Sequence, residues 1–182
     1  MPQFWLLGVA ASISYFVMLG VTSNMILVVQ SFGGSVTAGA TMAVPLFAAG
    51  LISKLVAGFM IDRFGSRPVW IASLALMFAG CALFIPGQIA LVPFASLLLG
   101  LGWGANYTLI QARVGDLFPT ASLGRVLGAI TLLDAGGAAA GPFVMAYIAD
   151  TFDSYQPSFV LMCALLVVAA ACWNLLERSR KW

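Results

Sequence analysis

Residues 58–68 read GFMIDRFGSRP, and this short stretch lies between two long apolar runs. It carries two arginines and one aspartate, although only 8% of the 182 residues are charged and 62% are hydrophobic. The mean hydropathy of the chain is +1.05. Several apolar runs reach the roughly 20 residues that a helix needs to cross a bilayer. The stretch is therefore predicted to connect two membrane-spanning helices.

The apolar runs on either side of this connection predict an all-α membrane protein that forms a single six-helix bundle. The spans are expected near residues 4–29, 38–60, 69–86, 89–111, 126–149 and 157–176, and glycine, proline and small polar residues separate them. Helices are expected because lipid offers no partners for unpaired backbone groups. The ten-residue segments of alternating polarity that are typical of a membrane β-barrel are missing from the sequence.

The basic residues are distributed unevenly along the chain and predict its orientation. Seven of the eight lie in alternate connections or at the C-terminus, namely Arg63, Arg67, Arg113, Arg125, Arg178, Arg180 and Lys181. The positive-inside rule makes that side cytoplasmic, and both termini are expected there. The compact connections favour a bacterial inner membrane as the location of this multi-pass protein.

Composition also excludes several classes of function. The chain has no histidine and no cluster of carboxylates, so an enzyme is not expected. The three cysteines, Cys81, Cys163 and Cys172, all fall inside apolar runs without the spacing of metal ligands. We therefore expect no metal and no cofactor. The formal net charge of +2 does not indicate nucleic acid as a partner.

The charged connection has a recognisable pattern. Gly58, Asp62, Arg63, Gly65 and Arg67 resemble the G-x-x-x-D-R-x-G-x-R loop motif of the major facilitator superfamily of secondary transporters. Ser66 departs from it, because many members carry a basic residue there. The stretches 100–119, GLGWGANYTLIQARVGDLFP, and 124–159 resemble the fourth and fifth spans of a C-terminal half in that family.

This resemblance implies a partner and a role for the motif. Family members have twelve spans in two halves, with the transport path between them. The chain is then expected to pair, within the lipid bilayer, with an N-terminal six-span half or with a second copy of itself. The motif is expected to act as a gating loop. A non-transporting six-span structural subunit, or an inactive fragment, is the alternative.

Two charges are predicted to lie well inside spans. Lys54 precedes Asp62 by eight residues, and Asp134 follows Arg125 by nine. At 1.5 Å per residue these positions lie roughly 12 Å and 14 Å from the cytoplasmic ends. Charges at such depth usually mark a transport pathway or a pair. An ion pair across neighbouring helices and a substrate site are both consistent with the matching depths.

The sequence around Lys54, GLISKLVAGFMIDRFG at 50–65, resembles monocarboxylate and oxalate:formate transporters. In those members an arginine that binds the substrate carboxylate stands where Lys54 stands here. Asp134 occupies a position where oxalate-type members carry a second cation. The resemblance therefore implies a small organic anion such as a monocarboxylate. Because an aspartate beside a lysine in a low-dielectric cavity also offers a proton site, Asp134 is expected to be the counter-ion of Lys54 and a candidate proton carrier in symport.

Other polar and aromatic residues have two interpretations each. Asn24, Asn106, Tyr107 and Gln111 are expected either to contact substrate or to form hydrogen bonds between helices. Trp5, Trp70, Trp173 and Tyr155 lie near the ends of spans, where interfacial anchoring is expected.

Overall fold

The computed structural model describes residues 2–179, and in this part of the chain all regular structure is helical. The long helices are α1 (Pro2–Ser31), α3 (Ala43–Phe64), α4 (Ser66–Phe84), α5 (Val92–Leu117), α6 (Leu123–Phe152) and α7 (Gln156–Ser179), with a short α2 (Val36–Thr41) and single 3-10 turns η1 (Ile89–Leu91) and η2 (Thr120–Ser122). Six segments of residues 2–179 are long and apolar enough to cross a membrane. The predicted all-α class and the six spans are confirmed.

One predicted span differs in detail. Residues 38–60 were expected to form one continuous helix, but the helix breaks at Met42, between α2 and α3. Pro45 lies in the first turn of α3. A proline ring clashes with the carbonyl four residues earlier, here Thr41, so α2 cannot continue into α3 without distortion.

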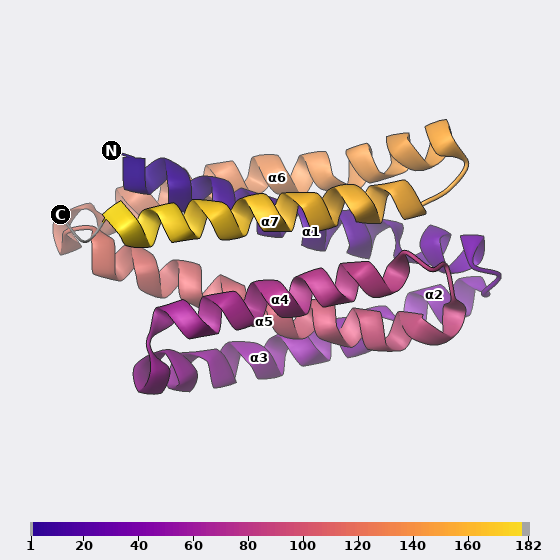
Figure 1. The fold of residues 1–182 in the computed structure, drawn as a ribbon, viewed down its shortest axis with the longest axis horizontal. Coiled ribbons are helices and arrows are strands. Elements are labelled where there is room, and N and C mark those ends of the chain that lie inside the picture. The colour runs from indigo at the N-terminus through magenta and orange to yellow at the C-terminus, as the bar shows by residue number, and fades with distance from the viewer. Residues whose placement is uncertain (1, 180–182) are drawn as a thin grey trace.

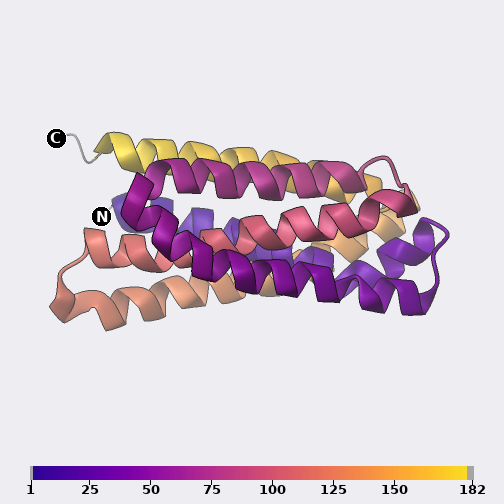
Figure 2. The same ribbon diagram turned by 90° about the horizontal axis from the view of Figure 1, so that it is seen from below.

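The helices form two groups of three. Figure 1 shows α1, α6 and α7 in one group and α3, α4 and α5 in the other, and α2 lies at one end of the bundle. Within these groups α1 packs on α6 and α7, and α5 packs on α3 and α4. Seen from below in Figure 2, α3 runs at an angle across the bundle. The groups meet mainly where α4 packs on α7.

The bundle collects the basic connections at one end. The joints α3–α4 and α5–α6 lie at the end where α1 begins and α7 ends (Figure 1). Arg63, Arg67 and Arg125 are exposed there. Arg180 and Lys181 lie outside the described residues. The geometry matches the predicted clustering of positive charge, while the assignment of that end to the cytoplasm stays a prediction.

Backbone contact at glycines holds the closest helix pairs. A Cβ on Gly100 or Gly104 of α5 would overlap the carbonyl oxygens of Leu46 or Gly50 in α3. A Cβ on Gly137 would likewise overlap the carbonyl oxygen of Ser12 in α1. In lipid, helices associate through packing and small residues rather than through hydrophobic burial, so these contacts set the α3–α5 and α1–α6 separations.

Candidate functional site

Lys54 lies in the middle of α3, and its ammonium group rests on two aromatic rings of α5. Lys54 Nζ is 4.6 Å from the ring centroid of Trp103 and 4.4 Å from that of Tyr107. These rings are four residues apart and so lie on the same face of α5. Such cation–π contacts contribute roughly 0.5–2 kcal/mol and leave the positive charge in place. The cation is thus stabilised without being neutralised.

Tyr15 of α1 completes this aromatic group. Its ring is edge-on to Trp103, with centroids 6.2 Å apart, and it also meets Tyr107 with centroids 6.4 Å apart. Side chains of α1, α3 and α5 therefore form one group, in which the two rings of α5 contact both Lys54 and Tyr15. We call Tyr15, Lys54, Trp103 and Tyr107 the aromatic site. Sequence reasoning named Lys54 and Tyr107 but missed Tyr15 and Trp103; the four-residue spacing of Trp103 and Tyr107 within one span was the available signal.

Asp134 of α6 is a buried carboxylate in the vicinity of Tyr15. Only 7% of Asp134 is exposed, and its Oδ1 atom has no hydrogen-bond partner among the described residues. Asp134 and Tyr107 both lie within electrostatic range of the Tyr15 phenol. Tyr15 therefore interacts both with Asp134 and with the rings that hold Lys54.

The structure does not bring Lys54 and Asp134 into direct contact. Within residues 2–179 no ion pair joins them. The ion pair across neighbouring helices, which was the first interpretation, is not formed there, because α3 packs on α5 and α4 whereas α6 packs mainly on α1. Equal depth from one membrane face does not determine which helices are adjacent, so the sequence pattern had no means of showing this separation.

The other predicted contact residues are spread over the bundle. Asn24 Nδ2 donates to the carbonyl oxygens of Gly20 and Pro142, at 3.0 Å and 3.2 Å, and so links α1 to α6. Asn106 is 0% exposed, and neither amide atom has a partner in the described part of the chain. Gln111 is exposed on α5. Of these four candidates, Tyr107 is the one placed beside Lys54.

Trp70 and Trp173 are not interfacial anchors, contrary to expectation. Each is 1% exposed, and the two rings stack with centroids 4.0 Å apart and an interplanar angle of 10°. The guanidinium of Arg113 lies 5.3 Å from the Trp173 ring. Arg113 was expected in the connection to the next span, but α5 continues to Leu117, and Arg113 lies within the helix and is 2% exposed. Trp5, by contrast, is 59% exposed.

The motif residues lie at a tight joint and not in a loop. Asp62 and Arg63 belong to the last turn of α3, and Arg67 lies in the first turn of α4. Gly65 alone separates the helices, with φ +81°, a conformation that strains any residue with a Cβ. The basic side chain of Arg63 in the last turn also suits the negative end of the helix dipole.

Comparison with known proteins identifies the family. The model for the Major Facilitator Superfamily matches residues 4–182. The chain therefore belongs to the Major Facilitator Superfamily, a family of membrane transporters. A solved structure of an auto-inhibited POT family peptide transporter superposes with a TM-score of 0.81 over 97% of this chain, at 18% identity, and shows the same fold.

Curated relatives are similar at moderate identity. The uncharacterised MFS-type transporter YdeG of Bacillus subtilis is 33% identical over 129 residues, which are 68% of this chain and 30% of the relative. The MFS antiporter QDR2 of Candida albicans is 26% identical over 133 residues, 71% of this chain and 26% of the relative. The chain thus spans less than a third of the length of the curated relatives it matches.

Proposed function

We propose that this chain is the C-terminal six-span half of a secondary active transporter that moves a small organic anion by alternating access. Family membership supports transport as the general activity. The observation that carries the choice of an anion is the aromatic site, where the ammonium of Lys54 is held inside the apolar bundle on Trp103 and Tyr107. A membrane-embedded charge is costly and marks a functional site by default.

The chemistry of the site favours a monocarboxylate. Rings withdraw little charge from a lysine, so the ammonium of Lys54 remains able to attract a carboxylate as a point charge. A second carboxylate on the same ligand would find no second cation among the four side chains of the aromatic site, so its desolvation would not be offset by a charge pair. A ligand with one carboxylate and an otherwise apolar body fits the aromatic site, which contains one cation and three aromatic rings.

Asp134 supports a role for protons in the same cycle. It is the buried carboxylate of α6, and its Oδ1 atom lacks a hydrogen-bond partner in the described part of the chain. A carboxyl group in such surroundings exchanges a proton when the charge near it changes. We propose that anion binding at Lys54 and protonation of Asp134 are linked through Tyr15, which lies near Asp134 and contacts Trp103 and Tyr107, the two rings that hold Lys54.

The partner in this proposal is an N-terminal six-span half or a second copy. Large apolar side chains of α3 and α6 face outward, including Leu55 and Leu132, which are 75% and 76% exposed. At Gly58 of the motif a Cβ would meet open space, so among residues 2–179 no neighbouring atom uses the close approach that a glycine permits. Both features suit a surface against which another helical bundle packs.

Anion binding to the purified chain in nanodiscs tests the proposal. Isothermal titration with acetate, pyruvate and benzoate is expected to show binding, with weaker binding of oxalate and none of the neutral acetamide. Lys54→Ala should weaken monocarboxylate binding at least tenfold, whereas Lys54→Arg should retain it.

Arg125→Ala is the matched control, because Arg125 is an exposed basic residue of the same chain that lies away from the aromatic site. Equal loss of binding in Arg125→Ala, or binding of acetamide as strong as that of acetate, would contradict an anion site at Lys54. Absence of any Lys54-dependent binding would favour a non-transporting subunit.

A further inference from the structure

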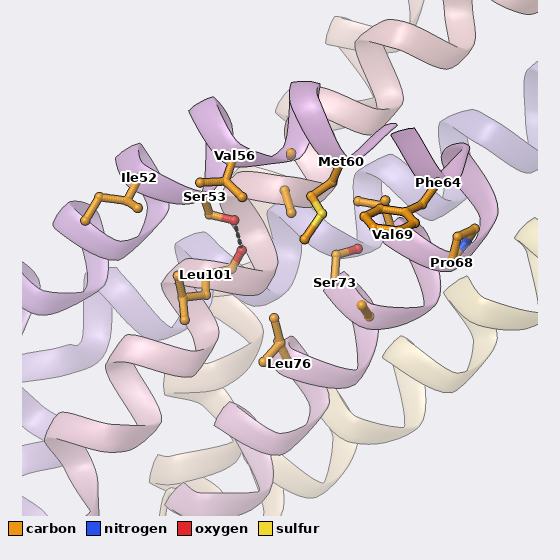
Figure 3. A pocket seen from close by; sticks show the side chains of 13 residues that line it. Ile52, Ser53, Val56, Met60, Phe64, Pro68, Val69, Ser73, Leu76 and Leu101 are labelled. Carbon is orange, nitrogen blue, oxygen red and sulfur yellow. Dashed lines mark hydrogen bonds between the residues drawn. The ribbon is translucent and has the colours of Figure 1, made fainter. Parts of the chain in front are cut away.

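A groove between α3 and α4 opens on the surface of the bundle, and α5 forms its floor. The two helices both pack closely on α5 but touch each other little, so they diverge above it. The groove has a volume of about 350 Å³. Figure 3 shows Ile52 towards one end and Phe64 and Pro68 at the other, with Met60 between them.

The wall of this α3–α4 groove offers almost nothing to a polar ligand. Two serines line it, and both hydroxyl groups are already used: Ser53 donates to the carbonyl oxygen of Leu101, and Ser73 to that of Trp70. The remaining lining residues are apolar. An occupant must therefore be a hydrocarbon along most of the groove.

The length of the groove matches one leaflet of a bilayer. From Ile52 to Phe64 there are twelve helical steps, or about 18 Å at 1.5 Å per residue. The hydrocarbon core of a bilayer is about 30 Å thick, so one leaflet supplies about 15 Å. The groove thus runs from the basic end of the bundle to about the middle of the membrane, as a lipid acyl chain does.

The mouth of the groove carries positive charge. Arg63 and Arg67 are both exposed, and they adjoin the lining residues Phe64 and Pro68. The guanidinium of Arg63 lies 5.6 Å from the Phe64 ring, directly at the rim. Asp62 is exposed at the same end, so two cations face one carboxylate there. Guanidinium groups are well matched to phosphate oxygens, and the excess positive charge favours an anionic head group.

We propose that the α3–α4 groove binds one anionic phospholipid from the leaflet on the basic side of the membrane. One acyl chain lies along α3 between Ile52 and Phe64, and the phosphate contacts Arg63 and Arg67. A lipid without net charge fills the apolar part of the groove equally well, but its head group is attracted less strongly by the two arginines. The proposal is independent of what the chain transports.

Photo-crosslinking in nanodiscs tests the site with the full chain. Phosphatidylglycerol and phosphatidylcholine with the same diazirine-labelled acyl chain are compared, and labelled peptides are mapped by mass spectrometry. Labelling of residues 52–76 is expected to be at least fivefold stronger with phosphatidylglycerol. The double variant Arg63→Gln, Arg67→Gln should reduce this preference to less than twofold.

Filling the groove provides a second, independent test. Ala72 is exposed and lines the groove, whereas Ala75, exposed on the same helix, faces a different hollow beside Leu166. Ala72→Phe should lower labelling by phosphatidylglycerol at least fivefold, and Ala75→Phe should leave it within twofold. The proposal would be overturned by equal labelling with the two lipids, or by equal effects of Ala72→Phe and Ala75→Phe on labelling. It would also be overturned if the chain forms a dimer that Ala72→Phe dissociates.

Discussion

Stacking of Trp70 on Trp173 places two of the largest side chains of the chain in full contact at the basic end of the bundle. Truncating a large buried aromatic residue typically costs about 3–5 kcal/mol. We expect Trp173→Ala to lower the free energy of unfolding by about 3 kcal/mol, measured by thermal unfolding in detergent. The matched control Trp5→Ala removes a ring that is 59% exposed and should change it by less than about 0.5 kcal/mol.

A similar loss in both tryptophan variants would contradict the buried position of Trp173. The sequence placed both tryptophans near the ends of spans, and this was correct. It did not show whether they point to lipid or into the bundle, since that depends on α4 meeting α7. Contact between helices a hundred residues apart leaves no mark in a single sequence.

Lys54 and Asp134 carry separable parts of the proposed cycle. Because no ion pair joins them in the described structure, each is expected to act without the other as a direct partner. Lys54→Ala should abolish anion uptake. Asp134→Asn should retain anion binding within about threefold but make uptake insensitive to an imposed pH gradient, measured in proteoliposomes that contain the assembled transporter.

Loss of anion binding in Asp134→Asn would show that the two side chains work as a unit. The charges themselves were predictable, because lysine and aspartate stand out in apolar spans. The surroundings of these charges were less predictable. In the sequence Trp103 and Tyr15 look like ordinary residues of apolar spans, and the packing of α1 and α3 on α5 brings them together in the aromatic site.

At the scale of the helices, neighbouring glycines of α6 differ sharply in their surroundings. A Cβ on Gly137 would overlap Ser12 of α1, while a Cβ on Gly136 would meet open space. Gly137→Ala should therefore force α1 and α6 apart and destabilise the chain by about 1–3 kcal/mol. Gly136→Ala should be neutral or stabilising by up to about 1 kcal/mol, because alanine favours a helix more than glycine does.

Thermal unfolding in one detergent compares the two variants directly. Equal destabilisation would mean that the α1–α6 contact is not formed as described. The glycines of these spans are visible in the sequence, but the sequence does not show which of them face another helix. Gly100, Gly104, Gly137 and Gly141 do so, whereas Gly58, Gly128 and Gly136 do not.

α4 and α7 are joined by ring pairs near both ends. Trp70 stacks on Trp173, and Phe84 stacks on Phe159 with centroids 4.6 Å apart and an interplanar angle of 7°. The two helices run antiparallel, so each pair joins the start of one helix to the end of the other. This register fixes α4 against α7 along their length and connects the two groups of three helices.

The whole molecule has an internal exchange symmetry in its pairings. Helices α1, α3 and α4 correspond in this order to α5, α6 and α7. Under this correspondence the α1–α6 contact matches the α5–α3 contact, and the α4–α5 contact matches the α7–α1 contact. All four contacts are present. Such inverted repeats of three helices occur within each six-span half of the family. The chain was predicted as one bundle of six spans; this symmetry lay below the level of detectable sequence repetition.

A complete pathway is expected to need another bundle. Liposomes that contain the chain alone should take up no anion while cross-linking shows monomers, because the aromatic site then has no opposing wall. Co-reconstitution with an N-terminal six-span half should restore uptake. Robust uptake by a demonstrated monomer would refute the pairing. The surface that pairs cannot be deduced from composition, since lipid and protein partners both select apolar side chains.

The joint at Gly65 is expected to act in the assembled transporter as a latch on the inward-facing side. Asp62→Asn removes the one carboxylate of the motif, which lies in the last turn of α3. The variant should change the rate of uptake by at least threefold, and it should change by as much the maleimide accessibility of cysteines introduced into the cavity on the basic side of the transporter. Arg125→Gln, at the same end of the bundle but outside the motif, should change neither.

The pairing of α1 with α6 has a consequence for how the ribosome delivers this chain. The Ser12 hydroxyl donates to the carbonyl oxygen of Leu133, 121 positions later, and Asn24 donates to that of Pro142, 118 positions later. At roughly 5–20 residues per second, translation of this interval takes about 6–24 s. During that time α1 has entered the bilayer without its principal neighbour, and its polar side chains and glycines face lipid or the insertion machinery. Packing of α1 on α6 therefore cannot begin until the fifth crossing of the bundle has been synthesised, and until then Ser12 lacks the acceptor that it has in the folded bundle.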